Sequence, residues 1–123
     1  MNISRNFLVI GALWLCVGVS LGIYMGAKQD FTLAPVHAHI NLLGFTLMTV
    51  FGIAYRVIPD LAQNSLAVVH FWLHQLGVLV VLISLFLLLS WIMPGIVPVL
   101  AVAEIVVFIG IIAWTVNVIR TVT

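Results

Sequence analysis

The sequence predicts an all-α membrane protein of four transmembrane helices, and two observations carry that prediction. Hydrophobic residues make up 65% of the 123 residues, whereas charged residues make up only 6%. A soluble domain carries about a quarter charged residues, so a chain of this composition cannot cover itself with a polar surface. The apolar residues also fall into four stretches of roughly twenty residues, the length that crosses the hydrocarbon core of a bilayer.

Turn-forming and charged residues separate the four stretches. Pro35 suits the first turn of the second helix, where its missing N–H does no harm, and Asn64 or Ser65 is a suitable N-cap for the third helix. The first stretch is longer than the roughly 7–15 apolar residues of a signal peptide, so we expect a retained helix. Residues 1–123 are predicted to form a single four-helix domain, with helices at about 6–26, 35–57, 65–92 and 95–120.

The basic residues predict the orientation of the helices. Arg5, Arg56 and Arg120 fall on one side of the membrane and Lys28 on the other, so the positive-inside rule places both termini in the cytoplasm. The net charge of +1 and the lack of a basic run argue against a nucleic-acid partner. The single cysteine, Cys16, cannot form an intrachain disulfide, and we expect it to be a small packed residue.

Polar side chains inside a membrane are costly and mark functional sites, and His37 and His39 form the first such pair. On a helix their side chains point about 200° apart, so they cannot bind one metal ion together. They can reach two spaces on opposite sides of the helix, which suits a ring of identical subunits. A heme takes one axial ligand on each face, and its apolar porphyrin fits between helices. The alternative is two histidines bonded to water or to carbonyls near the membrane surface.

His70 and His74 are four residues apart and therefore share a helix face. They could bind a small metal ion such as copper or zinc, although no third ligand is evident beside them. The alternative is hydrogen bonding across helices or to a loop. Glu104 lies near the middle of the fourth helix, where an ionised carboxylate costs about 2.5–3.5 kcal/mol. We expect it to be protonated or paired with a histidine or arginine, as a support for a ligating imidazole, a proton relay or a link between helices.

Two neighbouring motifs resemble the catalytic subunit of the heme–copper oxidases. Residues 37–45 read His-Ala-His-Ile-Asn-Leu-Leu-Gly-Phe, followed by Phe-Gly-Ile-Ala-Tyr at 51–55 and Pro-Asp-Leu at 59–61. The second motif is Val-His-Phe-Trp-Leu at 69–73, continuing to Gly77. This segment is most similar to the tenth and eleventh helices of the cbb-type oxidases and the related nitric oxide reductases. The flanking helices are similar in hydropathy only.

In the family, the first histidine of this pair binds the high-spin heme and the second binds the low-spin heme. The resemblance implies that His37 and His39 each bind a different heme b. The catalytic subunit of that family has three repeats of four helices, so a homotrimer of this chain would rebuild the twelve-helix ring. Each heme would then lie at a subunit boundary, with His39 of one subunit facing His37 of the next. The resemblance also implies a bacterial inner membrane and an unknown redox partner, a quinone or a cytochrome.

The departures from the family pattern limit what is carried over. The copper-binding histidines of the family and the tyrosine bonded to one of them have no counterpart here, so copper and oxygen reduction are not expected. His70 belongs to the His-Phe-Trp motif but is not a heme ligand in the family, and His74 has no family role. The sequence therefore predicts an electron-transferring membrane cytochrome. Two alternatives stay open: heme-based binding or sensing of NO, O2 or CO, and a non-heme metal-binding or accessory assembly subunit.

Overall fold

A computed structural model describes residues 1–122 and is helical throughout apart from short connections. Over that range, four helices are long and apolar enough to cross a membrane, so the all-α, four-span prediction is confirmed. The second of these spans is built from three consecutive segments, the middle one a π-helix. The elements are α1 (Ile3–Lys28), α2 (Ala34–His39), the π-helix η1 (Ile40–Thr46), α3 (Leu47–Val57), η2 (Pro59–Ala62), α4 (Ser65–Leu89), η3 (Pro94–Ile96) and α5 (Val97–Val122).

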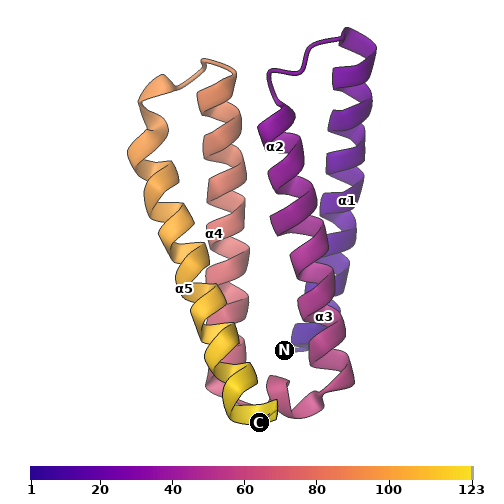
Figure 1. The fold of residues 1–123 in the computed structure, drawn as a ribbon, viewed down its shortest axis with the longest axis vertical. Coiled ribbons are helices and arrows are strands. Elements are labelled where there is room, and N and C mark those ends of the chain that lie inside the picture. Colours follow the sequence, from indigo (N-terminus) through magenta and orange to yellow (C-terminus); the bar gives the residue numbers. More distant parts are fainter. Residues whose placement is uncertain (123) are drawn as a thin grey trace.

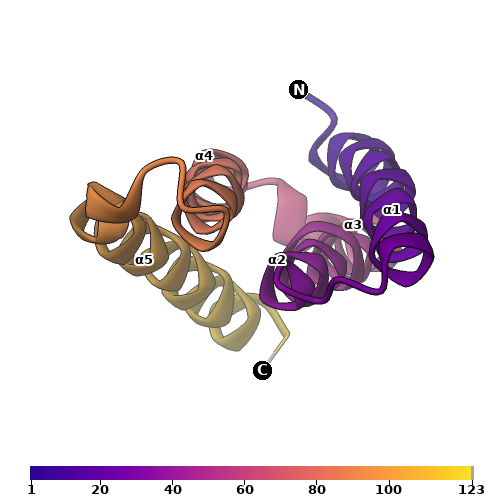
Figure 2. The same ribbon diagram turned by 90° about the horizontal axis from the view of Figure 1, so that it is seen from above.

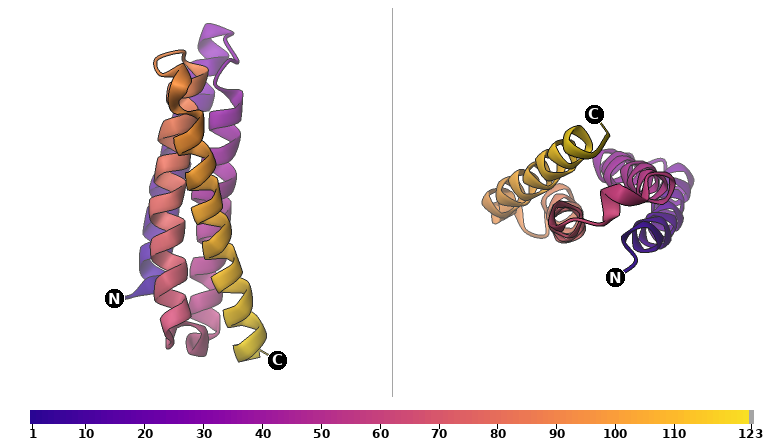
Figure 3. Two further views of the ribbon diagram at one scale, coloured as in Figure 1. Left: turned by 90° about the vertical axis from the view of Figure 1, so that its left-hand side faces the viewer. Right: turned by 90° about the horizontal axis from the view of Figure 1, so that it is seen from below.

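The four spans run alternately up and down, and both termini lie at the same end of the bundle (Figure 1). We call this the termini end. Seen from above, the helices form two pairs, with α1 beside the α2–α3 helix and α4 beside α5 (Figure 2). Figure 3 shows the bundle from the side and from below, and in the view from below α4 again lies beside α5 and α1 beside the α2–α3 helix. The packing of one pair against the other therefore decides which side chains meet in the middle.

Local side-chain hydrogen bonds explain where the helices start. Oδ1 of Asn2 accepts from the backbone N–H of Arg5 at 3.0 Å and begins α1. Asn64 does the same for α4, accepting from the N–H of Ala67 at 3.3 Å, which confirms one of the two predicted N-caps. Pro35 lies in the first turn of α2 as expected. α1 ends at Gln29, whose φ of 52° places it in the left-handed region that stops a helix.

Each helix buries only one face, and its other faces are apolar and exposed, which suits a lipid environment. Cys16 lies on such an exposed face of α1. The prediction of a packed cysteine is therefore wrong for the single chain, because α1 has a neighbour on one side only. The buried face of α1 is a narrow stripe that includes Ser4, Phe7, Gly11 and Gly18.

The π-helical segment η1 directly follows His39 and was not predicted. Single π turns inside α-helices occur often at functional sites, because the extra residue redirects the side chains beside it. Gly44 in this segment allows close packing against α1, since a Cβ there would lie 2.7 Å from Cγ of Trp14. The segment thus changes the helical register between the histidine pair and the buried aromatic residues of α3.

Candidate functional site

His37 points toward α1 and lies in a notch made by two glycines one helical turn apart. Its Nδ1 is 2.8 Å from the carbonyl oxygen of Gly18, and a Cβ at Gly22 would lie 2.9 Å from its Cε1. Because a carbonyl oxygen only accepts, Nδ1 carries the proton and Nε2 keeps its lone pair. Nδ2 of Asn41 donates to that Nε2 at 3.2 Å. Both ring nitrogens of His37 are thus used within the chain.

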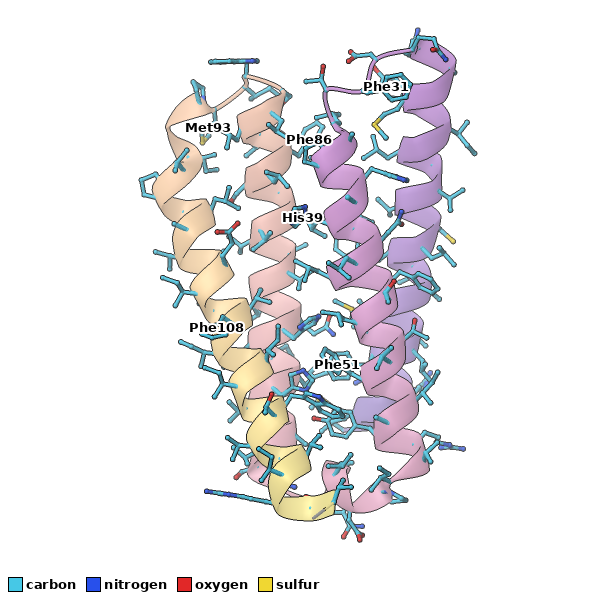
Figure 4. The ribbon with its side chains drawn as sticks, viewed as in Figure 1. Phe31, His39, Phe51, Phe86, Met93 and Phe108 are labelled. Carbon is cyan, nitrogen blue, oxygen red and sulfur yellow. The ribbon has the colours of Figure 1, made fainter. Side chains whose placement is uncertain are left out.

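His39 points to the other side of the same helix, toward α4 and α5 (Figure 4). Its Nδ1 donates to the carbonyl oxygen of Pro35 at 2.7 Å, so its Nε2 also keeps the lone pair. That Nε2 makes no hydrogen bond with any residue in the range 1–122. His39 lines a groove of about 210 Å³ whose walls are otherwise almost wholly apolar. The other lining residues are Leu42, Leu43, Val81, Glu104, Val107, Phe108 and Ile111.

The opposite directions predicted for the two histidines are therefore present in the structure. His37 contacts α1, whereas His39 lines the groove beside α5. The expected alternative of histidines bonded to carbonyls is also visible, but those bonds occupy only Nδ1 of each ring. An N–H bonded to a backbone carbonyl is the usual way in which a metal-ligating histidine is oriented and its tautomer fixed.

Glu104 lines the same groove as His39 but is exposed at the lipid-facing surface of α5. Within residues 1–122 its carboxyl group makes no hydrogen bond or ion pair. The expected pairing with a histidine or arginine is therefore not made inside one chain. A carboxyl group on an otherwise apolar helix face is open to a polar partner from outside the chain.

His70 and His74 lie in the middle of the bundle, and both side chains are fully buried. Nδ1 of His70 is 2.9 Å from the hydroxyl of Tyr55 on α3. Nε2 of His74 donates to the carbonyl oxygen of Leu43 at 3.0 Å. The predicted alternative of hydrogen bonds across helices is thus what the structure contains. Phe7, Phe51 and Trp114 surround the two imidazoles; Figure 4 shows Phe51 between the helix pairs.

A second buried polar group, Asn117 on α5, joins three elements near the termini end. Its Nδ2 donates to the carbonyl of Leu61 at 2.8 Å, and its Oδ1 accepts from Nδ2 of Asn64 at 2.7 Å. Asn117 is 1% exposed. It holds the turn between α3 and α4 against α5, and the sequence reasoning did not single it out.

Asp30, in the connection between α1 and α2, lies outside the membrane spans. The hydroxyl of Thr32 donates to its Oδ1 at 2.6 Å, and the N–H of Thr32 donates to the same atom at 3.0 Å. These two bonds favour the ionised carboxylate and lower the pKa of Asp30 below its ordinary value of 3.8.

Several residues that shape the site were missed from the sequence. Gly18 and Gly22 form a Gly-x-x-x-Gly pattern, which is a known signal for close helix packing in membranes and could have been found. Asn41 and Tyr55 carried no such signal, because their importance depends on which histidine they meet. In the described part of the chain, residues 1–122, no group of three or more His, Cys, Asp or Glu side chains could hold a metal ion.

Known proteins provide no relative with which the site of this chain can be compared. No family model matches the chain, and neither a curated protein nor a solved structure matches it. The functional interpretation therefore rests on the residues themselves and on the motif resemblance of residues 37–77.

Proposed function

We propose that this chain is a heme b-binding membrane protein whose iron ligands are Nε2 of His39 and Nε2 of His37. The proposal rests on the hydrogen-bonding state that the imidazole rings of His37 and His39 have in common. Each donates its Nδ1–H to a backbone carbonyl, Gly18 for His37 and Pro35 for His39, and each keeps a lone pair on Nε2. The two Nε2 atoms face different sides of one helix, so they would bind two different irons.

The surroundings of His39 fit a heme well. Its Nε2 has no hydrogen-bond partner in residues 1–122, and aliphatic and aromatic side chains of η1, α4 and α5 line the groove. An apolar porphyrin can replace lipid against the aliphatic and aromatic part of these walls, and Glu104 is the one lining carboxyl group that would need a polar partner. Of the two histidines, His39 is therefore the ligand that needs no rearrangement.

His37 fits the same role after one local change. The amide of Asn41 donates to its Nε2 at 3.2 Å and would have to turn away before iron could bind there. Oδ1 of Asn41 is buried without a hydrogen bond among the described residues, so this amide is not strongly held by its other end. The asymmetry predicts that His39 is the stronger ligand of the two.

The size of the groove supports a site shared between subunits. Its volume of about 210 Å³ lies below the roughly 300–1,000 Å³ of sites that enclose a ligand. One chain therefore provides one wall and one axial ligand, and a second chain would complete the site. This agrees with the trimeric ring that the motif resemblance implies, in which His39 of one subunit faces His37 of the next.

The chemistry proposed is electron transfer. A heme b held by His37 and His39 would supply a one-electron redox centre. The backbone carbonyls of Gly18 and Pro35 would orient the two imidazoles, and the apolar side chains of the groove would exclude water. A lipid-soluble quinone or a cytochrome remains the proposed class of redox partner.

The test is a visible absorption spectrum of the purified full-length protein supplied with heme, recorded together with its oligomeric mass. We expect a Soret band that is lost in His39→Ala and weakened in His37→Ala, and a trimeric mass. Ser20→Ala, on the exposed face of α1, should keep the wild-type spectrum. A wild-type protein that shows no Soret band of bound heme after heme is supplied would exclude the proposal.

The same sample separates the alternatives. A reduced spectrum that carbon monoxide leaves unchanged supports two histidine ligands and electron transfer. A spectrum that carbon monoxide changes supports binding or sensing of a gas. A colourless protein that retains stoichiometric metal would instead favour the non-heme alternative.

A further inference from the structure

A cavity lies at the end of the bundle opposite the termini, and we call it the far-end cavity. Its volume is about 520 Å³, within the roughly 300–1,000 Å³ of sites that enclose a ligand. Its walls come from the end of α1, the connection between α1 and α2, and the end of α4 with the turn that follows (Figure 1). The far-end cavity shares no lining residue with the His39 groove, so a ligand here would be independent of heme.

Asp30 gives the far-end cavity a fixed negative charge. The hydroxyl and the backbone N–H of Thr32 both donate to its Oδ1, at 2.6 and 3.0 Å, and both residues line the cavity. These bonds lower the pKa of Asp30 below 3.8, so its carboxyl group is ionised at neutral pH. Within residues 1–122 its Oδ2 has no hydrogen-bond partner and the carboxylate has no ion pair. Lys28, the only lysine or arginine at this end, does not line the cavity.

Two aromatic residues with free hydrogen-bond donors lie on the same walls. Tyr24 and Trp91 are 52% and 80% exposed, and both line the cavity. Neither the hydroxyl of Tyr24 nor the indole N–H of Trp91 bonds to a residue in the range 1–122. Tyrosine and tryptophan favour the membrane surface, where the ring contacts apolar groups and the polar atom faces lipid headgroups. The cavity therefore offers an anion that can accept from a cation, and two donors that can bind a second, anionic group.

The backbone of Trp91 indicates that its side chain matters at this position. Its φ of 59° lies in the left-handed region, which bulky residues rarely adopt. Trp91 directly follows Ser90, the C-cap of α4, where glycine is the usual residue because it adopts this conformation without strain. Strained backbone of this kind clusters at ligand sites. Ending the helix would favour a glycine here, so the tryptophan is better explained by what its indole contacts in the cavity.

The rest of the cavity wall is apolar and extends toward the middle of the bundle. Figure 4 shows Phe86 between α4 and α2 near this end. Phe86 lies one helical turn before Ser90, and Leu21 lies one turn before Met25, so the apolar lining continues at least one turn below the polar rim. An acyl chain can cover such a wall. A ligand that fits both parts has a polar head with two opposite charges and an apolar tail.

We propose that the far-end cavity binds a membrane lipid with a phosphoethanolamine headgroup. Its primary ammonium donates to Oδ2 of Asp30, and its phosphate accepts from the hydroxyl of Tyr24 and the indole N–H of Trp91. One acyl chain lies against Leu21 and Phe86. A primary ammonium suits the carboxylate because it has three N–H donors, and the aromatic faces attract the same charge. A lipid with a phosphate but no ammonium would instead place its negative charge beside Asp30, which is repulsive.

The test measures lipid binding to the full-length protein without heme, in dodecyl maltoside micelles, by native mass spectrometry. We expect dioleoyl phosphatidylethanolamine to bind about fivefold more tightly than dioleoyl phosphatidylglycerol, the difference that one ion pair at a partly exposed site gives. Asp30→Asn should remove this preference, and its amide oxygen can still accept the two bonds from Thr32. Asp60→Asn is the matched control, because Asp60 lies in η2 at the termini end, and it should keep the preference.

NMR then locates the bound lipid. Addition of dioleoyl phosphatidylethanolamine should shift the indole N–H signal of Trp91, whereas that of Trp72, exposed on α4 outside the cavity, should stay in place. Phosphoethanolamine without acyl chains should bind much more weakly, because the apolar wall is left uncovered.

Three results would overturn the proposal: equal binding of the two lipids by the wild-type protein, an unchanged preference in Asp30→Asn, or free phosphoethanolamine that binds as tightly as the lipid. Should Asp30→Asn not fold, the wild-type preference and the Trp91 signal still decide. Because no heme is present, failure here is distinguishable from failure of the proposed heme function.

Discussion

Nε2–H of His74 on α4 donates a hydrogen bond to the carbonyl oxygen of Leu43 on the π-helical segment, at 3.0 Å. Leu43 lies four residues after His39, so this bond fixes the helix with the proposed ligands against the second helix pair. In a bundle whose helices gain little from the hydrophobic effect in lipid, such directional bonds and close packing decide the arrangement.

The first prediction concerns this bond. His74→Leu keeps a side chain of similar size but leaves the Leu43 carbonyl without its donor. We expect a loss of about 1–3 kcal/mol in the free energy of unfolding, the usual cost of an unpaired buried polar group. Equilibrium unfolding in mixed detergent micelles measures this. His39→Leu is the control, because its ring bonds only within its own helix. Equal losses in the two variants would contradict the assigned role of the bond.

The second prediction concerns the packing of α1 on the second span. A Cβ at Gly18 would overlap Oδ1 of Asn41 and lie 3.0 Å from Cγ2 of Ile40. Gly18→Ala should therefore destabilise the bundle by about 1–3 kcal/mol, as overpacking does. Gly26→Ala is the matched control, because nothing lies within 4 Å of its Cβ position. In Gly26→Ala we expect no loss, since alanine favours a helix over glycine by about 1 kcal/mol.

The third prediction concerns Asn117. Replacing it with alanine removes the bonds to the Leu61 carbonyl and to Nδ2 of Asn64, which hold the turn between α3 and α4. The Leu61 carbonyl and Nδ2 of Asn64 then keep only the long bond of 3.4 Å that joins them to each other, so we expect a cost of about 1–3 kcal/mol. Backbone amides around Leu61 should also exchange faster with solvent. Thr115→Ala, whose hydroxyl bonds only the Ile111 carbonyl of its own helix, should change neither measurement.

The fourth prediction concerns pH at the connection between α1 and α2. Thr32→Val removes the hydroxyl that donates to Asp30 at 2.6 Å but keeps the backbone N–H bond. The pKa of Asp30 should rise toward 3.8 without reaching it. Because the folded-state pKa is the lower one, these bonds stabilise the folded chain above pH 3.8, and the effect disappears as the pH falls through the folded-state pKa. NMR titration of the Asp30 carboxyl measures the shift, and Thr32→Ser should leave it unchanged.

Part of the candidate site could be read from the sequence. The two-residue spacing of His37 and His39 was enough to predict that their side chains reach opposite sides of one helix, because helical geometry is local. The groove beside His39 could not be predicted, since Val81, Glu104 and Phe108 come from helices far away in the chain. Nor could the notch of Gly18 and Gly22 be assigned to His37, because the contact depends on the register between two helices.

The sequence by itself determined that the chain forms four helices long and apolar enough to cross a membrane, with breaks where charged and turn-forming residues gather. Hydropathy and length suffice for this, because each span satisfies its own backbone hydrogen bonds in lipid. Only the tertiary structure decided that Tyr55 meets His70, that His74 meets Leu43, and that a π turn follows His39. These relationships depend on how the helix pairs pack, and packing between apolar helices is set by small residues and single hydrogen bonds that no local pattern reveals.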